Sequence, residues 1–423
     1  MSMPRPLVSV LMPSFNQGGF IEAAARSVLG QDYGPLELVV ADGGSTDDTL
    51  RRLEGLLGEF GTRLRWISEP DSGPAQAVNK ALRLARGGII GWLNSDDLYA
   101  PGAVAVAARH LAANPDTAMV YGEAAHIDAR GLSLGRYPTR PPSASLQAFQ
   151  DGCFICQPTV FLRREVFDEV GPLDESLATA FDFELWLRIF RRLPGRVAHL
   201  DRVQAFSRLH PDCITQKSRR AVAVEGVRVL ARHVGKPRPR WLLTYLEELY
   251  DRYPFGGGPA DLRAHMAALA GELADCFDGA ARQALAAALA EDARLRLALP
   301  GAFADVYADG WAGQVLALRF AGVAGAGLSA RLRGRHAWPA HAPLALAIKT
   351  SWGEERRVRI EAAGPFELAI PFPDAAVGDN FLVLIESGDT FVPKAANPES
   401  ADGRRLAFKV EAFSIEPVAN HGK

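Results

Sequence analysis

Acidic side chains follow two of the strand-like runs in the amino-terminal half of the chain. Asp42 directly follows the apolar run at residues 36–41, and Asp96 and Asp97 follow the run at residues 89–93. In open α/β sheets, ligands bind outside the carboxyl ends of the strands. Carboxylates placed this closely repel one another, so their grouping favours a cation or a hydrogen-bond donor between them. Oxygen ligands without a nearby Cys or His suit Mg²⁺ or Mn²⁺, which usually bridge to substrate phosphates.

The elements that must position these residues alternate between strands and helices. Short apolar runs predict buried strands, and each is followed by residues with helical spacing. Continuous apolar strands alternating with helices are typical of an α/β fold with a parallel sheet covered on both faces. The expected strands lie at residues 7–12, 36–41, 64–68 and 89–93, and the expected helices near 18–30, 46–60, 74–86 and 101–113.

Two helix starts carry recognisable capping patterns. Ser45-Thr-Asp-Asp48 fits a capping box, and Ser72-Gly-Pro74 supplies a cap followed by a proline in the first turn. Asp47 and Asp48 are therefore interpreted as an acidic first turn that complements the helix dipole.

The rest of the chain changes character twice. Ala, Leu, Arg and Glu dominate from about residue 221 to 299, interrupted at residues 253–259, which predicts a helical connector. After residues 300–301 short alternating runs separated by turn residues predict an antiparallel β-sandwich. A length of 423 residues is compatible with about three domains. We therefore expect domains at residues 1–220, 221–300 and 301–423.

The composition limits the class of protein and its partners. The 47 basic and 49 acidic side chains nearly balance, which argues against a nucleic-acid binder. Four cysteines are too few and too scattered for a disulfide scaffold, which favours a reducing compartment. The amino terminus lacks the layout of a signal peptide, and no apolar run approaches the length of a membrane span. We expect a soluble, cytoplasmic protein.

A series of motifs in a fixed order carries a resemblance to a known family. The chain contains Asp42-Gly-Gly-Ser-Thr-Asp47, Trp92-Leu-Asn-Ser-Asp-Asp97, Cys156-Gln-Pro158, Val170-Gly-Pro-Leu-Asp174 and Phe181-Asp-Phe-Glu184. Together with residues 8–17, 68–73 and 209–210, these motifs resemble family 2 glycosyltransferases, and the match covers roughly residues 7–215. The resemblance implies the GT-A fold of nucleotide-diphospho-sugar transferases, with a Rossmann-like mixed sheet. The connector and the sandwich lie outside it.

The resemblance assigns residues to the donor and to a metal ion. Asp42 would contact the base or ribose, with Asp71 closing the other side, although Asp42 could instead shape the turn before a helix. Asp96 would bind a divalent ion (Mn²⁺ or Mg²⁺) at the donor diphosphate, with Asp97 assisting. Asn94 replaces the first acidic residue of the family's Asp-x-Asp motif. The remaining donor candidates are Pro13, Phe15, Lys80 and Ser95, and His210 is a candidate for the metal or the pyrophosphate.

Several of these assignments have an ordinary structural alternative. Lys80 could be a solvated helix lysine, and His210 could be a packed loop histidine. Asn94-Ser-Asp-Asp97 could be only a polar turn. Cys153 and Cys156 have no partner pair of Cys or His close by in the sequence, so they are interpreted as two small apolar residues rather than a zinc or redox site.

Asp182 matches the family's general base, and the competing interpretation is a helix N-cap. Many relatives have an acidic residue before it, where this chain has Phe181. Glu184 is a less favoured substitute. Gln157 and Trp186 are candidates for the acceptor side.

The sequence thus predicts an inverting, metal-dependent transfer of a sugar from a nucleotide diphosphate, most simply a UDP-sugar. The acceptor would be a glycan, a lipid-linked glycan or a protein, in bacterial surface polysaccharide synthesis. The competing hypothesis is a non-catalytic glycan- or nucleotide-binding protein with a degenerate transferase domain. An arginine-rich helix at residues 188–192 could touch a membrane, though a solvated face is favoured. Trp311, Trp338 and Trp352 could stack on sugars or fill the core of the sandwich.

Overall fold

The computed structural model describes residues 5–142, 146–252, 262–296, 306–321, 327–373 and 380–417. The chain forms two compact units, Met1–Trp241 and Leu242–Lys423. The first unit extends past the expected boundary at residue 220 and includes helix α8 (Arg219–His233). The expected helical connector is therefore divided between the two units. The expected interruption at residues 253–259 and the expected boundary at residues 300–301 lie outside the described residues.

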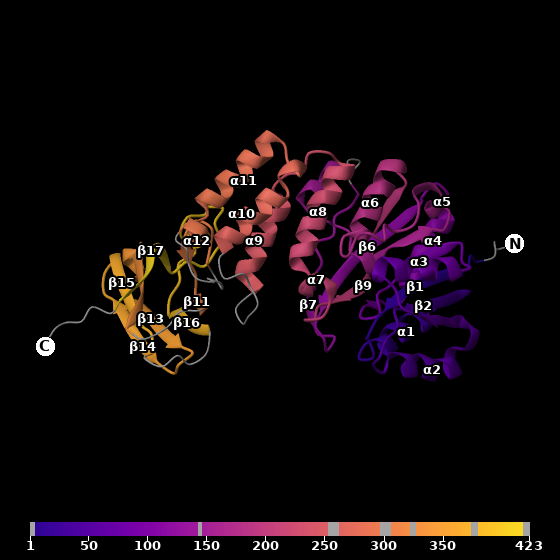
Figure 1. The fold of residues 1–423 in the computed structure, drawn as a ribbon, viewed down its shortest axis with the longest axis horizontal. Coiled ribbons are helices and arrows are strands. Elements are labelled where there is room, and N and C mark those ends of the chain that lie inside the picture. The colour runs from indigo at the N-terminus through magenta and orange to yellow at the C-terminus, as the bar shows by residue number, and fades with distance from the viewer. Residues whose placement is uncertain are drawn as a thin grey trace. The chain divides into compact units, whose positions relative to one another are not determined.

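A nine-stranded mixed sheet forms the centre of the first unit (Figure 1). Strands β1, β2, β3 and β4 are parallel, which confirms the prediction for this part of the chain. Strand β8 is antiparallel to both β4 and β6, and β9 returns parallel to β6. The path through the sheet is β3 (Leu64–Ser68), β2 (Leu36–Asp42), β1 (Val8–Ser14), β4 (Ile89–Trp92), β8 (Phe161–Arg163), β6 (Met119–Ile127), β9 (Val197–Arg208) and β5 (Leu98–Tyr99), with β7 (Ser133–Arg136) beside β6.

Helices cover both faces of this sheet because successive strand residues point to opposite sides. Val10 and Met12 pack in one buried cluster with residues of α1, α2 and α4, whereas Leu11 packs in a second cluster with residues of α3, α6 and α8. The helices of this unit are α1 (Ile21–Leu29), α2 (Thr49–Phe60), α3 (Pro74–Leu84), α4 (Ala103–Ala113), α5 (Val166–Val170), α6 (Phe181–Arg192), α7 (Ile214–Lys217) and α8.

The capping prediction for α2 was wrong. The helix begins at Thr49, and its N-cap residue Asp48 makes no side-chain capping bond. Asp47 instead accepts hydrogen bonds from the backbone N–H of Gly18, at 2.9 Å, and of Thr49, at 3.0 Å. Its carboxylate therefore ties the loop before α1 to the start of α2. At α3 the N-cap is Gly73 rather than Ser72, and Pro74 occupies the first helical position as expected.

The second unit contains helices followed by two antiparallel sheets. Its helices are α9 (Arg240–Arg252, which begins at the unit boundary), α10 (Leu262–Glu272), α11 (Gly279–Glu291), α12 (Ala293–Arg296) and the short α13 (Pro393–Ala396). One sheet has the order β10 (Trp311–Ala312), β17 (Phe408–Pro417), β12 (Leu328–His336) and β15 (Gly364–Pro371). The other has the order β11 (Val315–Ala321), β16 (Asn380–Ser387), β13 (Leu344–Thr350) and β14 (Glu355–Ile360).

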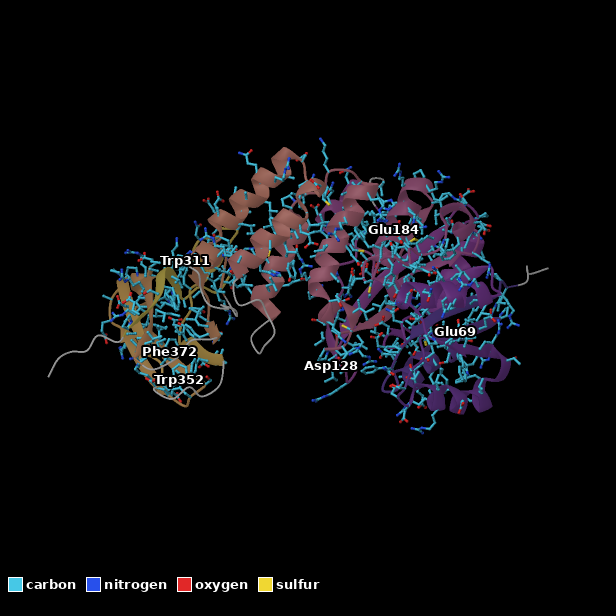
Figure 2. All side chains as sticks on the ribbon, viewed as in Figure 1. Glu69, Asp128, Glu184, Trp311, Trp352 and Phe372 are labelled. Carbon is cyan, nitrogen blue, oxygen red and sulfur yellow. The ribbon has the colours of Figure 1, made fainter. Side chains whose placement is uncertain are left out.

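Aromatic side chains fill the space between these sheets, which confirms the predicted sandwich. The rings of Phe320 in β11 and Phe413 in β17 lie 6.0 Å apart. Trp352 packs edge-on against Phe381 at 5.5 Å and lies 6.0 Å from Phe372, so its ring contributes to the packing of the sandwich (Figure 2). Across the described parts of both units, no helix combines the length and apolar character needed to span a bilayer.

Candidate active site

A pocket of about 490 Å³ lies at the carboxyl ends of the parallel strands. Seven of the residues singled out in the sequence line it, namely Pro13, Phe15, Asp71, Asn94, Ser95, Asp96 and Asp97. They come from the ends of β1, β3 and β4, so the sheet gathers side chains that are far apart in the sequence. The pocket is completed by residues that were not site candidates in the sequence analysis, among them Ser14, Gly43, Gly73, Ser207, Arg208 and Lys217.

Asp96 and His210 form a close pair at this pocket. The Asp96 Oδ2 atom lies 3.0 Å from His210 Nε2, and the His210 side chain is only 6% exposed. The His210 ring packs against Phe20 with the ring centroids 4.9 Å apart. The imidazole therefore has a fixed position beside the carboxylate of Asp96, which lines the pocket.

Asp97 holds the loop that carries Asp96. Its Oδ1 atom accepts a hydrogen bond of 2.7 Å from the backbone N–H of Arg208. Burial and the neighbouring charge of Asp96 raise the pKa of Asp97 well above its usual value. Arg208 in turn donates from Nε to the carbonyl oxygen of Asp96, at 2.6 Å. The acidic loop is thus joined to the end of β9 by its backbone as well as its side chains.

The residues of the loop can be tested for their fit to a divalent ion. Within the described ranges, no group of three His, Cys, Asp or Glu side chains comes together as a metal-binding cluster. Asp96 and His210 are two potential ligands, and Asn94 Oδ1 is held 3.2 Å from the indole nitrogen of Trp92. Metal ions at diphosphates are commonly held by one or two protein carboxylates and completed by phosphate oxygens and water. The Asp96–His210 pair therefore fits an ion that the donor itself helps to hold.

The carboxylate of Asp42 is buried and makes hydrogen bonds within the protein. Asp42 is 1% exposed, and its carboxylate accepts hydrogen bonds from the backbone of Gly44, at 3.0 Å, and of Ser45, at 2.8 Å. It also accepts one of 2.7 Å from Ser68 Oγ in the neighbouring strand β3. Asp42 is not among the described residues that line the pocket. These bonds fit the alternative interpretation, in which Asp42 shapes the turn after β2.

Asp71 lines the pocket beside this turn. A Cβ atom added to Gly43 would lie 2.8 Å from Asp71 Oδ2, so the absence of a side chain at Gly43 allows the close approach of the carboxylate. Burial raises the pKa of Asp71 above its usual value. Lys80 Nζ bonds the carbonyl oxygen of Pro70 and the carboxylate of Glu69, each at 2.9 Å, and thereby supports the loop that precedes Asp71.

Asp182 lies in the first turn of α6 and is not among the described pocket-lining residues. Its Oδ1 atom accepts a hydrogen bond of 2.7 Å from the backbone N–H of Phe183. Burial raises the pKa of Asp182 to about 6. Burial, followed by the nearby charge of Asp182, also raises the pKa of the Cys153 thiol to about 12. Cys153 and Cys156 are free thiols.

Trp92 connects the start of α6 to the acidic loop. The ring of Phe181, next to Asp182, stacks on Trp92 at 5.8 Å, and the Trp92 indole donates to Asn94 Oδ1. Gln157 Nε2 donates to the Trp92 carbonyl oxygen at 2.8 Å. Trp186 is fully buried, 6.4 Å from Trp92. Neither Gln157 nor Trp186 is among the described residues that line the pocket.

Glu225 of α8 holds the loop that leads into α6, and the sequence analysis missed it. Its carboxylate accepts hydrogen bonds from the backbone of Ala178, at 3.0 Å, Thr179, at 2.8 Å, and Ala180, at 2.9 Å, and from the Thr179 hydroxyl, at 2.8 Å. A single carboxylate thus fixes the backbone just before Asp182. A glutamate inside a helix carries no local signal of such a role.

Glu184, marked in Figure 2, has a different environment from Asp182. It is 3% exposed, accepts from Arg188 Nε at 2.8 Å and lies 2.9 Å from His233 Nε2. Arg188 also donates to the carbonyl oxygen of Gly171, at 3.1 Å, and of Pro172, at 2.8 Å. Glu184 is therefore committed to holding neighbouring elements together and is a poor substitute for a general base.

A mixed sheet covered by helices on both faces, with an acidic pocket at the carboxyl ends of its strands, defines the first unit as a GT-A fold. Residues 9–171 match the family model described as Glycosyl transferase family 2, so this part of the chain is a family 2 glycosyltransferase domain. The helices that carry Asp182 and Glu225 follow the matched residues.

Individual relatives agree with this family. An uncharacterized glycosyltransferase of Rickettsia felis is 30% identical over 203 residues, which cover 45% of this chain and 32% of the relative. A chondroitin synthase of Escherichia coli is 30% identical over 198 residues, covering 47% of this chain and 28% of the relative. The chain thus spans less than a third of the length of these two relatives.

A solved structure shares the fold. Residues 1–349 of S. aureus TarS, in complex with UDP-GlcNAc, are 16% identical, with a TM-score of 0.50. The superposition covers 68% of this chain and 87% of that one.

Proposed function

We propose that this chain is an inverting glycosyltransferase that moves a sugar from a nucleotide diphosphate to a hydroxyl group of a glycan or lipid-linked acceptor. The observation that carries the proposal is the Asp96–His210 pair at a pocket that is also lined by Asp71. Membership of residues 9–171 in the transferase family supports the reaction class. The complex of TarS with UDP-GlcNAc supports a UDP-sugar as the donor, and the chondroitin synthase relative supports polysaccharide synthesis.

In this reaction Asp182 acts as the general base. The acceptor oxygen forms a bond to the anomeric carbon, the bond from that carbon to the diphosphate oxygen breaks, and the acceptor proton passes to an Asp182 carboxylate oxygen. A base with a pKa of about 6 is largely ionised at neutral pH and is still basic enough to take a proton. The raised pKa also means that the carboxylate is not stabilised by a strong cationic partner.

The remaining residues would bind the donor and hold the reacting groups in position. Asp71 and the side-chain-free Gly43 form the wall against which the nucleoside would rest. Asp96 and His210 would hold a divalent ion, Mn²⁺ or Mg²⁺, which supplies positive charge beside the departing diphosphate. Glu225 fixes the backbone before Asp182, and proper placement of reacting groups is worth a large part of the rate enhancement.

The competing hypothesis is a binding protein whose transferase domain has lost activity. Asn94 in place of an acidic residue and Phe181 beside Asp182 are the departures that favour it. The desolvation that raises the pKa of Asp182 favours catalysis, because strongly perturbed pKa values cluster at functional sites.

The direct test is a panel of nucleotide sugars, each added to the purified chain with Mn²⁺ or Mg²⁺. We expect one donor to raise the melting temperature and to be hydrolysed slowly, and chelation of the metal should abolish both effects, because a ligand that binds only the native state stabilises it. Stabilisation without hydrolysis, together with no transfer to any glycan acceptor, would support the binding protein. An absence of both effects for every donor would refute the proposal.

A further inference from the structure

The β6–β7 hairpin presents an ordered turn on the first unit. Strands β6 and β7 are antiparallel, with Ala125 opposite Arg136. The Asp128 Oδ1 atom accepts hydrogen bonds of 2.8 Å from the backbone of both Arg130 and Leu132, and Gly131 has a φ of 87°. Because the Asp128 carboxylate closes the turn, the residues beyond it are held in place.

The outer surface of this hairpin is both apolar and basic. Leu132 is 62% exposed and Leu134 is 56% exposed, although leucines are usually buried. Arg130, Arg136 and Arg140 are also exposed, and none of them forms an ion pair within the described part of the chain. Leu134 and Arg136, two residues apart in β7, share one face of the strand. The hairpin surface thus carries two exposed leucines with arginines on either side in the sequence.

The base of the hairpin is fastened to the pocket. The backbone N–H of Leu209 donates to the Ile127 carbonyl oxygen at 2.8 Å, and Arg208 donates to the carbonyl oxygen of Asp128 at 2.9 Å. Arg208 and Leu209 line the pocket, and His210 follows them. Asp128 marks the hairpin at the edge of the first unit in Figure 2. The base of the hairpin is therefore bonded directly to the segment that precedes His210.

We propose that the β6–β7 hairpin docks this protein on a lipid bilayer that contains anionic headgroups. Exposed leucines gain free energy by entering the interface between headgroups and acyl chains, and arginines gain by approaching lipid phosphates. A second copy of the chain fits less well, because apposed hairpins would bring arginines of like charge together. Binding at this surface would place the pocket beside the membrane, where a lipid-linked acceptor is presented.

The test is flotation of the full chain with vesicles of phosphatidylcholine alone and of phosphatidylcholine with phosphatidylglycerol. We expect binding to the anionic vesicles that falls as salt is raised. The double variants Leu132→Ser/Leu134→Ser and Arg130→Gln/Arg136→Gln should each lower the partition coefficient about tenfold or more. Leu57→Ser, at an exposed leucine of α2, is the matched control and should bind as the unmodified chain does.

Three outcomes would overturn the proposal. The first is no binding to anionic vesicles, and the second is binding that the hairpin variants leave unchanged while their melting temperatures stay normal. The third is a concentration-dependent dimer in sedimentation velocity that the hairpin variants abolish, which would assign the surface to a second copy. Because Asp182→Asn should leave vesicle binding intact, a failure of the proposed reaction and a failure of docking are distinguishable.

Discussion

His210 Nε2 lies 3.0 Å from Asp96 Oδ2, although 114 positions separate the two residues in the chain. The contact arises because β9 pairs with both β5 and β6, which brings the segment after Arg208 back to the loop that follows β4. Arg208 bonds to this loop through both its backbone and its guanidinium. These two bonds fix the end of β9, which precedes His210, against the loop that carries Asp96.

Replacing Asp96 should weaken binding of metal and donor together. We expect Asp96→Ala to lower the affinity for UDP in the presence of Mn²⁺ by roughly 100-fold or more, because the variant removes the carboxylate facing the pocket. Titration calorimetry measures this directly. Asp48→Asn is a suitable control, since Asp48 is exposed and pairs with Arg51. Unchanged affinity in Asp96→Ala would rule out a metal site at this pair.

Replacing Asp182 should affect turnover and leave the donor site intact. We expect Asp182→Asn to lower kcat by about 10²- to 10⁴-fold, the usual contribution of a general base. The affinity for the donor should change little, because Asp182 is not among the described residues that line the pocket. The melting temperature at neutral pH should rise, because the amide removes a charge that burial destabilises. A normal kcat in this variant would remove Asp182 from the mechanism.

The pH profile of kcat/KM should have an acidic limb that is set by the ionisation of Asp182. Burial raises its pKa to about 6, so the carboxylate is ionised above that pH and protonated below it. Only the ionised form accepts the acceptor proton, so kcat/KM should be constant above the pKa and fall about tenfold per pH unit below it. A pH profile in which a limb near 6 persists in Asp182→Asn would assign that limb to another group.

Adding a methyl group at Gly43 should disturb the wall of the pocket that bears Asp71. The new Cβ atom would lie 2.8 Å from Asp71 Oδ2, so Gly43→Ala must displace the carboxylate. We expect a higher KM for the donor with little change in the free energy of unfolding, because the atoms that must move are the far end of the Asp71 side chain. Gly19→Ala is the matched control, because no heavy atom lies within 4 Å of a Cβ at Gly19. An equal KM for the donor in both variants would contradict a role of Asp71 in donor binding.

Changing Glu225 should act on catalysis through the loop before Asp182. In Glu225→Gln an NH₂ group replaces one of the two oxygens that accept from residues 178–180, so the loop loses part of its anchor. We expect kcat to fall about 10- to 100-fold while the affinity for the donor is kept, because misplacing a reacting group is costly. Steady-state kinetics and donor titration separate the two effects. Glu169→Gln, at an exposed glutamate that pairs with Arg196, should behave normally. A parallel loss of donor affinity in Glu225→Gln would indicate a general structural defect.

Local patterns in the sequence were sufficient for the strands and helices of the first unit. The expected strand at residues 64–68 has the observed bounds, and the expected helix at 101–113 is observed as α4 (Ala103–Ala113). The spacing of apolar residues and the turn residues determine such elements over a few positions. They can therefore be predicted without knowledge of tertiary contacts. The same local information placed Asp96 and Asp97 at the end of a strand, and both line the pocket, whereas Asp71 and Asn94 were assigned through the family resemblance.

Tertiary structure alone decided what each polar side chain bonds to. Asp42 and Asp71 look equivalent in the sequence, yet the fold buries Asp42 against Ser68 and leaves Asp71 at the pocket. Glu225 and Arg208 belong to no motif that the sequence analysis recognised, and only the packing of α8 and the pairing of β9 gave them their partners. A strand or helix follows from neighbours along the chain. The environment of a carboxylate depends on groups that folding brings from distant positions, and these groups determine whether it is buried, hydrogen-bonded or charged.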